Sequence, residues 1–222
     1  IKHTDGKVHA FDLNNKQIEI LNENAALNNL NNINSVKKGL WNDSKTFLNL
    51  SDSDDLAFAT PAVDITHSNT ITIDEYLSAN TIENVDLIML DVEGAEYNIL
   101  LGAQQQLKKD NNYPNIVFEI HSLYVDWSNG LDNTPIVKLL KDTGYTVFSI
   151  RDFQGNYDMK NTPIELIPSS ETYIEGPKHG FNMLAIKNLS LIDNNLFKIC
   201  TNVSPKYIVN KNPKLHHPID GL

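Results

Sequence analysis

Short apolar runs alternate with amphipathic segments along this chain, and the alternation predicts strands separated by helices. Two of the runs, 85–90 and 116–121, are almost continuously apolar, which is typical of strands covered on both faces of a sheet. The other runs are shorter or are interrupted by polar residues. The predicted strands lie at 8–11, 33–36, 46–50, 85–90, 116–121, 146–150 and 181–186.

Three segments between these strands have the periodicity of helices. The first opens at Asn14 and places apolar residues on one face. The second has an apolar stripe that starts at Ala95 and continues to about Lys109. The third, 136–142, follows a Thr-Pro pair that favours a helix start, and it ends before Gly144, which favours a helix stop.

Strands that alternate with helices predict an α/β fold, with a mostly parallel sheet and helices on both faces. Residues 151–180 are poor in apolar periodicity and predict loop, and the periodicity is weak again from 188 onward. No repeat or linker divides the chain. We therefore expect one domain over 1–187, with 188–222 as its C-terminal extension.

Charge and cysteine content narrow the classes of partner. Eighteen Lys and Arg against 28 Asp and Glu give a net charge of −10, which disfavours a nucleic-acid partner. No apolar run has the length of a membrane span, so no membrane partner is expected. The single cysteine, Cys200, fits a reducing compartment and a cytoplasmic location.

Acidic side chains follow several predicted strands, at the edge where an α/β sheet binds its ligands. Asp12 ends the first strand, where a carboxylate can accept hydrogen bonds from ribose hydroxyls or can cap the following helix. Asp91, Glu93 and Glu96 crowd the end of the strand at 85–90. We expect Asp91 and Glu93 to be catalytic, whereas Glu96 either binds substrate or serves the first turn of the helix.

His121 ends the strand at 116–121 and shares a face with Glu119. An imidazole pKa of about 6.5 suits proton transfer, so we favour His121 as the general base toward a hydroxyl. The alternative is a capping or core histidine at the end of the strand. Glu93 or Glu119 would serve instead if burial raised its pKa, and Glu119 is otherwise expected to bind substrate. The other histidines lack the spacing of metal ligands, and no metal site is predicted.

Several motifs resemble the FkbM family of S-adenosylmethionine-dependent methyltransferases. They are Gly-Lys-Val-His-Ala-Phe-Asp at 6–12 with Asn14, Leu-Asn-Asn at 27–29, Gly-Leu-Trp at 39–41, Thr-Ile-Asp at 72–74, and Val-Asp-Leu-Ile-Met-Leu-Asp-Val-Glu-Gly-Ala-Glu at 85–96. The last of these is the most specific. With the strands at 114–121 and 181–186, the resemblance extends over about 6–186.

The resemblance implies a Rossmann-like class I methyltransferase fold with strand order 3-2-1-4-5-7-6. It implies S-adenosylmethionine as cofactor and methyl transfer to a hydroxyl of a sugar, a glycan or another small hydroxylated metabolite. In that alignment Asp12 holds the cofactor ribose, Leu40 and Trp41 lie near the adenine, and Asp91 borders the methyl group.

The chain begins after the point where the family has its first strand and glycine-rich loop, so we expect a sheet that lacks this strand. Two other function classes stay open. One is a methyltransferase-like fragment or binding module without cofactor affinity. The other is a different nucleotide-dependent Rossmann enzyme, although the chain has no Gly-x-Gly-x-x-Gly motif to support it.

Overall fold

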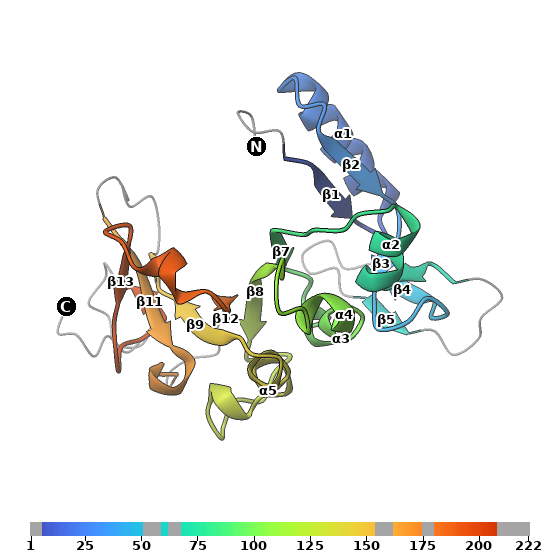
Figure 1. Cartoon of the computed structure of the whole chain (residues 1–222). Helices are drawn as coiled ribbons and strands as arrows, with labels where there is room; N and C mark the ends of the chain where they lie inside the picture. The colour runs from blue at the N-terminus through green and yellow to red at the C-terminus, as the bar shows by residue number, and fades with distance from the viewer. Residues whose placement is uncertain (1–5, 51–58, 62–67, 154–161, 175–179, 208–222) are drawn as a thin grey trace. The chain divides into compact units, whose positions relative to one another are not determined.

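The computed structural model describes residues 6–50, 59–61, 68–153, 162–174 and 180–207 (Figure 1). Contacts within the chain group it into two compact units, each of which is described by itself. Unit 1 comprises Ile1–Ile82 with Asn98–Ala103, and unit 2 comprises Glu83–Tyr97 with Gln104–Leu222.

Unit 1 begins with a strand, a helix and a second strand that pairs parallel to the first. These elements are β1 (Val8–Phe11), α1 (Asn15–Leu27) and β2 (Ile33–Val36), with Val8 opposite Ile33. Asn14 caps α1, because its side chain accepts a hydrogen bond from the backbone N–H of Lys16. The first predicted strand–helix–strand segment is therefore confirmed.

Tyr76 of α2 (Ile73–Ala79) holds that helix on one face of the β1–β2 pair. Its hydroxyl lies 2.8 Å from Nδ1 of His9 and accepts a hydrogen bond from Asn34 at 2.9 Å. Ser35 points to the opposite face, where its hydroxyl donates to Asn22 of α1. Helices thus cover both faces of this pair, as expected for an α/β fold.

Two further strand pairs complete unit 1. A parallel pair joins β3 (Gly39–Leu40) to β6 (Thr70–Ile71), and an antiparallel pair joins β4 (Leu48–Leu50) to β5 (Ala59–Pro61). The long predicted helix from Ala95 is interrupted, giving α3 (Glu96–Leu101) and α4 (Gln104–Leu107). At the interruption Gly102 accepts a hydrogen bond from the Asp74 backbone N–H and lies against the carbonyl of Trp41.

Unit 2 contains a six-stranded sheet with the order β13-β11-β9-β12-β8-β7. Helix α5 (Pro135–Asp142) packs against β9, and its residues Val137 and Leu140 are fully buried. The strands are β7 (Leu87–Leu90), β8 (Asn115–His121), β9 (Thr146–Ile150), β11 (Ile164–Pro168), β12 (Gly180–Ile186) and β13 (Phe197–Ile199). The remaining elements of unit 2 are η1 (Leu131–Asn133), β10 (Asp152–Phe153), η2 (Ser169–Glu171), η3 (Leu189–Ile192) and β14 (Lys206–Tyr207).

The sheet is mixed, which corrects the expectation of a mostly parallel one. β7 pairs parallel with β8, but β12 runs antiparallel to both β8 and β9, and β11 runs antiparallel to β9. Parallel neighbours need a long crossover, usually a helix, and α3 with α4 supplies one between β7 and β8. No α-helix lies in the described parts of 151–180, and the strands around this segment pair antiparallel.

Strand order within each unit agrees with the order that the resemblance implies. The order β7-β8-β12-β9 corresponds to 4-5-7-6, and the β2-β1 pair corresponds to 3-2. Among the described strands β1 and β7 belong to separate hydrogen-bonded sheets. Among those strands β1 pairs only with β2, and β7 pairs only with β8.

Burial of β7 differs from the prediction that both of its faces are covered. Ile88 and Leu90 are buried, whereas Leu87 is 54% exposed and Met89 is 70% exposed. Leu87 and Met89 alternate with the two buried residues and so share the exposed face of the strand. Apolar composition alone therefore overestimated the cover of this strand.

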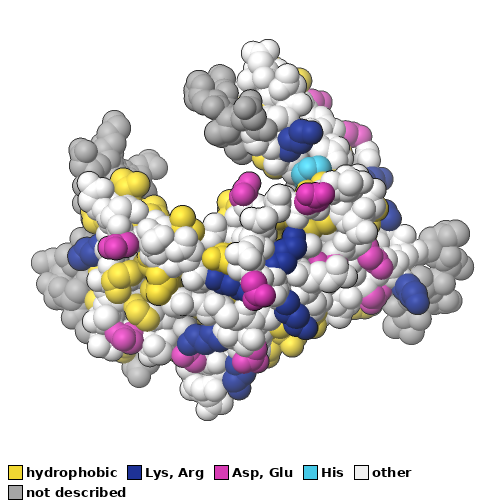
Figure 2. Space-filling model, in the orientation of Figure 1, with side chains coloured by type: hydrophobic (Ala, Val, Ile, Leu, Met, Phe, Trp, Pro, Cys, Tyr) yellow, Lys and Arg dark blue, Asp and Glu magenta, His cyan; other side chains and the backbone are white. Residues whose placement is uncertain are grey.

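The segment predicted to be mostly loop contains part of the core. Leu166 and Ile167 of β11 are fully buried. β13 pairs parallel with β11, although β13 lies after residue 187, where the apolar periodicity of the sequence is weak. Figure 2 shows hydrophobic side chains gathered on the surface over β11, β13 and η3. The exposed members from these elements and their flanks are Ile164, Leu189, Leu191, Leu196 and Ile199.

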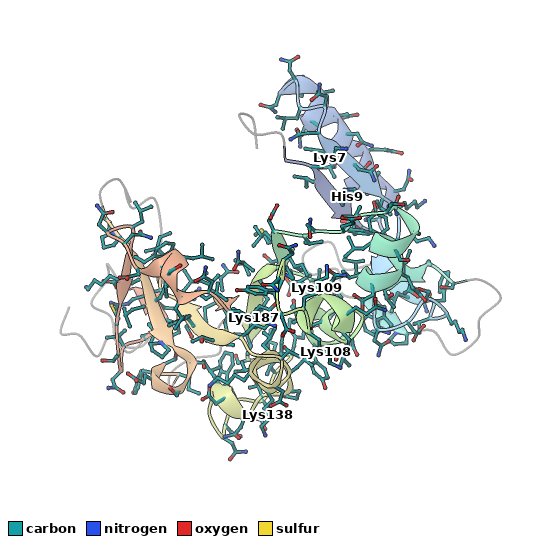
Figure 3. The ribbon with its side chains drawn as sticks, viewed as in Figure 1. Lys7, His9, Lys108, Lys109, Lys138 and Lys187 are labelled. Atoms are coloured by element: carbon teal, nitrogen blue, oxygen red, sulfur yellow. The ribbon has the colours of Figure 1, made fainter. Side chains whose placement is uncertain are left out.

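Lys187 lies directly after β12 and joins the ends of two neighbouring strands. Its Nζ donates a hydrogen bond to the carbonyl of Lys109 at 2.9 Å and lies 5.1 and 5.0 Å from the ring centroids of Tyr113 and Tyr145 (Figure 3). Tyr145 in turn donates to the carbonyl of Pro114. An ammonium held over aromatic rings is stabilised by cation–π attraction. Lys187, Tyr113 and Tyr145 therefore pack together at the end of the sheet that lies away from His121.

A buried ion pair joins β9 and β11 near their ends. Arg151, 5% exposed, donates to Glu165, 8% exposed, at 2.9 Å, and Lys198 donates to the other carboxylate oxygen at 2.7 Å. Burial alone would raise the pKa of Glu165, but the hydrogen bonds from Lys198 and Arg151 outweigh it and hold the pKa below its ordinary value. Glu165 is therefore ionised and paired at neutral pH.

Replacing Glu165 with Ala is expected to lower the free energy of unfolding by about 3 kcal/mol, because it leaves the buried Arg151 charge without this partner. Lys198→Ala is the control and should cost about 1 kcal/mol or less, since Lys198 is largely exposed. Because the folded pKa of Glu165 is lowered, its contribution is complete above the ordinary glutamate pKa of about 4.3 and is lost as pH falls through the folded value. Urea unfolding at several pH values measures this, and equal losses for both variants would contradict it.

Candidate functional site

Asp12 and the Leu40–Trp41 pair, which the resemblance assigns to the cofactor, lie in unit 1. Asp12 follows β1, and its Oδ1 accepts a hydrogen bond from the Asn14 backbone N–H at 2.7 Å. This bond forms the turn into α1, so one carboxylate oxygen has a structural role. Leu40 is half-buried in β3, and Trp41 is 8% exposed.

A tight turn follows β7 and carries two of the predicted catalytic residues. Glu93 has φ 52° and Gly94 has φ 98°, so both adopt the left-handed conformation. This conformation is costly for a residue with a side chain, and it reverses the chain between Asp91 and α3. Asp91 is thereby left exposed and Glu93 half-exposed at the carboxyl end of β7.

Glu96 closes this turn from inside. Glu96 is only 5% exposed. Its Oε1 accepts hydrogen bonds from the backbone N–H groups of Val92 at 3.0 Å and Gly94 at 3.4 Å. Burial raises the pKa of Glu96, against the opposing effect of these hydrogen bonds. The contacts assign Glu96 a structural role in the turn, and its contact with a substrate stays a prediction.

Glu119 and His121 alternate on β8 and face the same side of the sheet as Gly180, which pairs with His121. Oxygen atoms of Asp91, Glu93 and Glu119 lie within 4.8 Å of one another. Burial first, and then the charges of Asp91, Glu93 and Glu96, raise the pKa of Glu119, while Lys206 lowers it. The structure therefore brings three predicted site carboxylates together.

Hard cations such as Mg²⁺ prefer oxygen ligands, and three carboxylates at this spacing have the chemistry to hold one. Sequence spacing did not reveal this set, because two members follow β7 and the third is on the neighbouring strand. The sheet register is what brings them together.

His121 has a defined hydrogen bond at one ring nitrogen. Its Nδ1 accepts from the Leu123 backbone N–H at 3.0 Å. A neutral imidazole that accepts at Nδ1 carries its proton on Nε2. In this arrangement His121 offers a donor, not a free basic nitrogen, to the site.

Tyr124 is a site residue that the sequence analysis missed. Its hydroxyl donates to Oε2 of Glu93 at 3.0 Å, and its ring centroid lies 5.8 Å from that of His121. Burial and the hydrogen bond to Glu93 raise the pKa of the phenol, which stays protonated at neutral pH. Tyr124 lies in the turn after β8, where no motif marks it. Only its position beside Glu93 identifies it.

Carboxylates, an imidazole and a phenol lie at the carboxyl ends of neighbouring parallel strands. Ligands bind at this edge in α/β folds, so the protein falls in the ligand-binding α/β class. Comparison with family models identifies the member of this class. The model described as the methyltransferase FkbM domain matches residues 3–147, more than half of the chain.

The chain therefore belongs to the FkbM methyltransferase family, and it is a methyltransferase. Neither curated proteins nor solved structures gave a match to it. Within the described residues, no helix has the length and apolar character that crossing a membrane requires.

Replacing Glu96 with Ala is expected to lower the free energy of unfolding by about 1–3 kcal/mol, because two backbone N–H groups lose their acceptor. Glu96→Gln is the matched variant, since its amide oxygen keeps an acceptor without a buried charge. The raised pKa of Glu96 means that wild-type stability falls as pH rises from the ordinary glutamate pKa through the folded value. In chemical unfolding, the free energy of unfolding of Glu96→Gln should therefore rise relative to that of wild type over this pH range. Equal losses for Glu96→Ala and Glu96→Gln would contradict the role of Glu96 in the turn.

Proposed function

We propose that the chain transfers a methyl group from S-adenosylmethionine to a hydroxyl oxygen of a sugar, a glycan or another small hydroxylated metabolite. The observation that carries this proposal is the cluster of Asp91, Glu93 and Glu119 with His121 nearby on β8. Carboxylates accept hydrogen bonds from the hydroxyls of a polyol. Their negative charge also favours a cationic methyl donor. The family membership supplies the reaction class, and the cluster supports the choice of donor and acceptor.

The cofactor-side residues fit S-adenosylmethionine in their chemistry. Asp12 uses one oxygen for the turn into α1, which leaves the other oxygen to accept from a ribose hydroxyl. We assign Leu40 and Trp41 to the adenine side and Asp91 to the methyl side. When bound, S-adenosylmethionine supplies a methyl group on a positively charged sulfur.

The chain's own residues must orient the acceptor hydroxyl and remove its proton. An acceptor hydroxyl that takes up a methyl group must lose its proton, so the site needs a basic group to receive that proton. Sequence reasoning favours His121 for this role. The hydrogen bond from Leu123 to Nδ1 favours Glu119 instead, with His121 as a donor that orients the acceptor.

Glu119→Gln tests this assignment, because it keeps the size and polarity of the side chain while removing its basicity. We expect its turnover to fall by about 10² or more, as is typical of losing a general base. His121→Ala should lower turnover by less, since it removes an orienting donor. The assay follows labelled methyl transfer from S-adenosylmethionine to a panel of neutral monosaccharides and glycosides.

Parallel reactions with Mg²⁺ and with a chelator determine whether the carboxylate cluster requires a cation. If His121→Ala loses about 10² while Glu119→Gln is unaffected, the base is His121, as the sequence pattern predicts. If wild type transfers no methyl group to any acceptor and does not bind the cofactor, the chain is a binding module or another nucleotide-dependent enzyme.

Asp12→Asn isolates the cofactor role of Asp12, because an Asn oxygen can still accept the Asn14 backbone N–H that forms the turn. We expect this variant to bind S-adenosylmethionine about tenfold more weakly in calorimetry, corresponding to roughly 1.4 kcal/mol. Asp12→Ala should bind at least as weakly and also unfold more easily. Affinity equal to wild type in both variants would assign Asp12 to the turn into α1 alone.

The cellular site of this activity is proposed from one further residue. Cys200 is free, and burial raises the pKa of its thiol, so it is mostly protonated at neutral pH. A lone protonated thiol fits a reducing compartment, and we propose that the enzyme acts in the cytoplasm.

A further inference from the structure

Gly180 begins β12 and lies opposite His121 in the antiparallel pair of β12 with β8. A methyl group at position 180 would lie 2.4 Å from Cδ2 of His121 and 2.5 Å from Oε1 of Glu119. Non-bonded carbon atoms are normally separated by about 3.5–4.0 Å, so neither side chain could stay in place. Two predicted site side chains therefore occupy the space over this glycine.

The backbone does not explain why position 180 is a glycine. Positive φ angles occur at Gly94, Gly130 and Gly144 among the described glycines, but not at Gly180. An alanine could adopt the strand conformation of residue 180 without strain. Glycine in a strand instead marks a place where another group approaches closely, and here that group is the pair of side chains from β8.

We propose that Gly180 is a positioning residue for the methyl-transfer site, because the absence of its side chain lets Glu119 and His121 lie over the end of β12. The catalytic role of Gly180 rests on the proposed function, whereas its geometric role rests on the packing of Glu119 and His121 over this residue. With the space over residue 180 filled, the Glu119 carboxylate would leave the cluster with Asp91 and Glu93. The His121 ring would also turn away from the Leu123 backbone N–H.

The carboxylates of Asp91, Glu93 and Glu119 need close placement, because one oxygen atom of each lies within 4.8 Å of the others. Shifts of about 1 Å in a catalytic group can cost about 10² in rate. Gly180 thus acts through Glu119 and His121 without touching a reacting atom.

Gly180→Ala tests the proposal with a readout that needs no acceptor. Long-range proton–nitrogen NMR on the full chain shows which ring nitrogen of His121 carries the proton. In wild type we expect the proton on Nε2 and an accepting Nδ1. In Gly180→Ala we expect the accepting Nδ1 signal to shift or be lost. Gly39→Ala is the control, because it adds a methyl group to a strand glycine whose nearest neighbours are Leu13 and Leu48.

Turnover with S-adenosylmethionine and the acceptor panel gives the second readout, and we expect a loss of about 10² for Gly180→Ala. The NMR result stands even if wild type proves inactive, so failure of the positioning role can be told from failure of the proposed reaction. Unchanged His121 signals in Gly180→Ala would overturn the proposal. Wild-type turnover in that variant would overturn it as well.

A double-mutant cycle covers the case in which Gly180→Ala folds poorly. If the added methyl group collides with the imidazole, its cost in thermal or urea unfolding should shrink when His121 is also replaced by Ala. The same relief is expected, separately, in a Glu119→Ala background. Additive losses in both backgrounds would show that residue 180 acts on something other than these two side chains.

Discussion

The turn between β7 and α3 is the constraint on which the candidate site depends. Two consecutive residues, Glu93 and Gly94, adopt left-handed backbone conformations, and the buried carboxylate of Glu96 accepts hydrogen bonds from the backbone N–H groups of Val92 and Gly94. Strain at Glu93 and burial of an acidic group both oppose folding. The surrounding hydrogen bonds offset these costs, and the result is a rigid support for Asp91 and Glu93. The proposed chemistry requires that rigidity, because groups that accept a proton or orient a hydroxyl must be held in place.

Close packing of small residues sets the positions of the side chains that face this turn. The Tyr124 ring lies against Gly94, where an added methyl group would come within 2.7 Å of the ring. On the other strand, Glu119 and His121 lie over Gly180. Aromatic and acidic groups can therefore come close together from β7, β8 and the turn after β8. The same packing links Tyr124 to Glu93 by a hydrogen bond and to His121 by ring contact.

Sequence patterns predicted the longer strands and three helical segments, but missed α2 and several short strands, and predicted the sheet less well. The β1–α1–β2 segment, α5 and the strands at 115–121 and 146–150 were all expected from periodicity and helix signals. β11 was missed, because a strand of five residues between long polar segments has too little periodicity to stand out. The exposed face of β7 was missed for another reason. A run such as Leu87–Leu90 shows that a strand is apolar, but it does not show how many neighbours cover it.

Sequence by itself determined the chemistry available at this site: acidic residues at the ends of predicted strands, a histidine, and the Asp-Val-Glu-Gly-Ala-Glu segment by which the chain resembles the FkbM methyltransferases. Tertiary structure decided how those groups are used. It grouped Glu119 with Asp91 and Glu93 and directed Glu96 into the turn. It also placed a backbone N–H against Nδ1 of His121 and added Tyr124 to the site. The reason is physical: residue type sets which protons and charges a side chain can carry, whereas strand register, backbone conformation and packing set which of its atoms face a substrate.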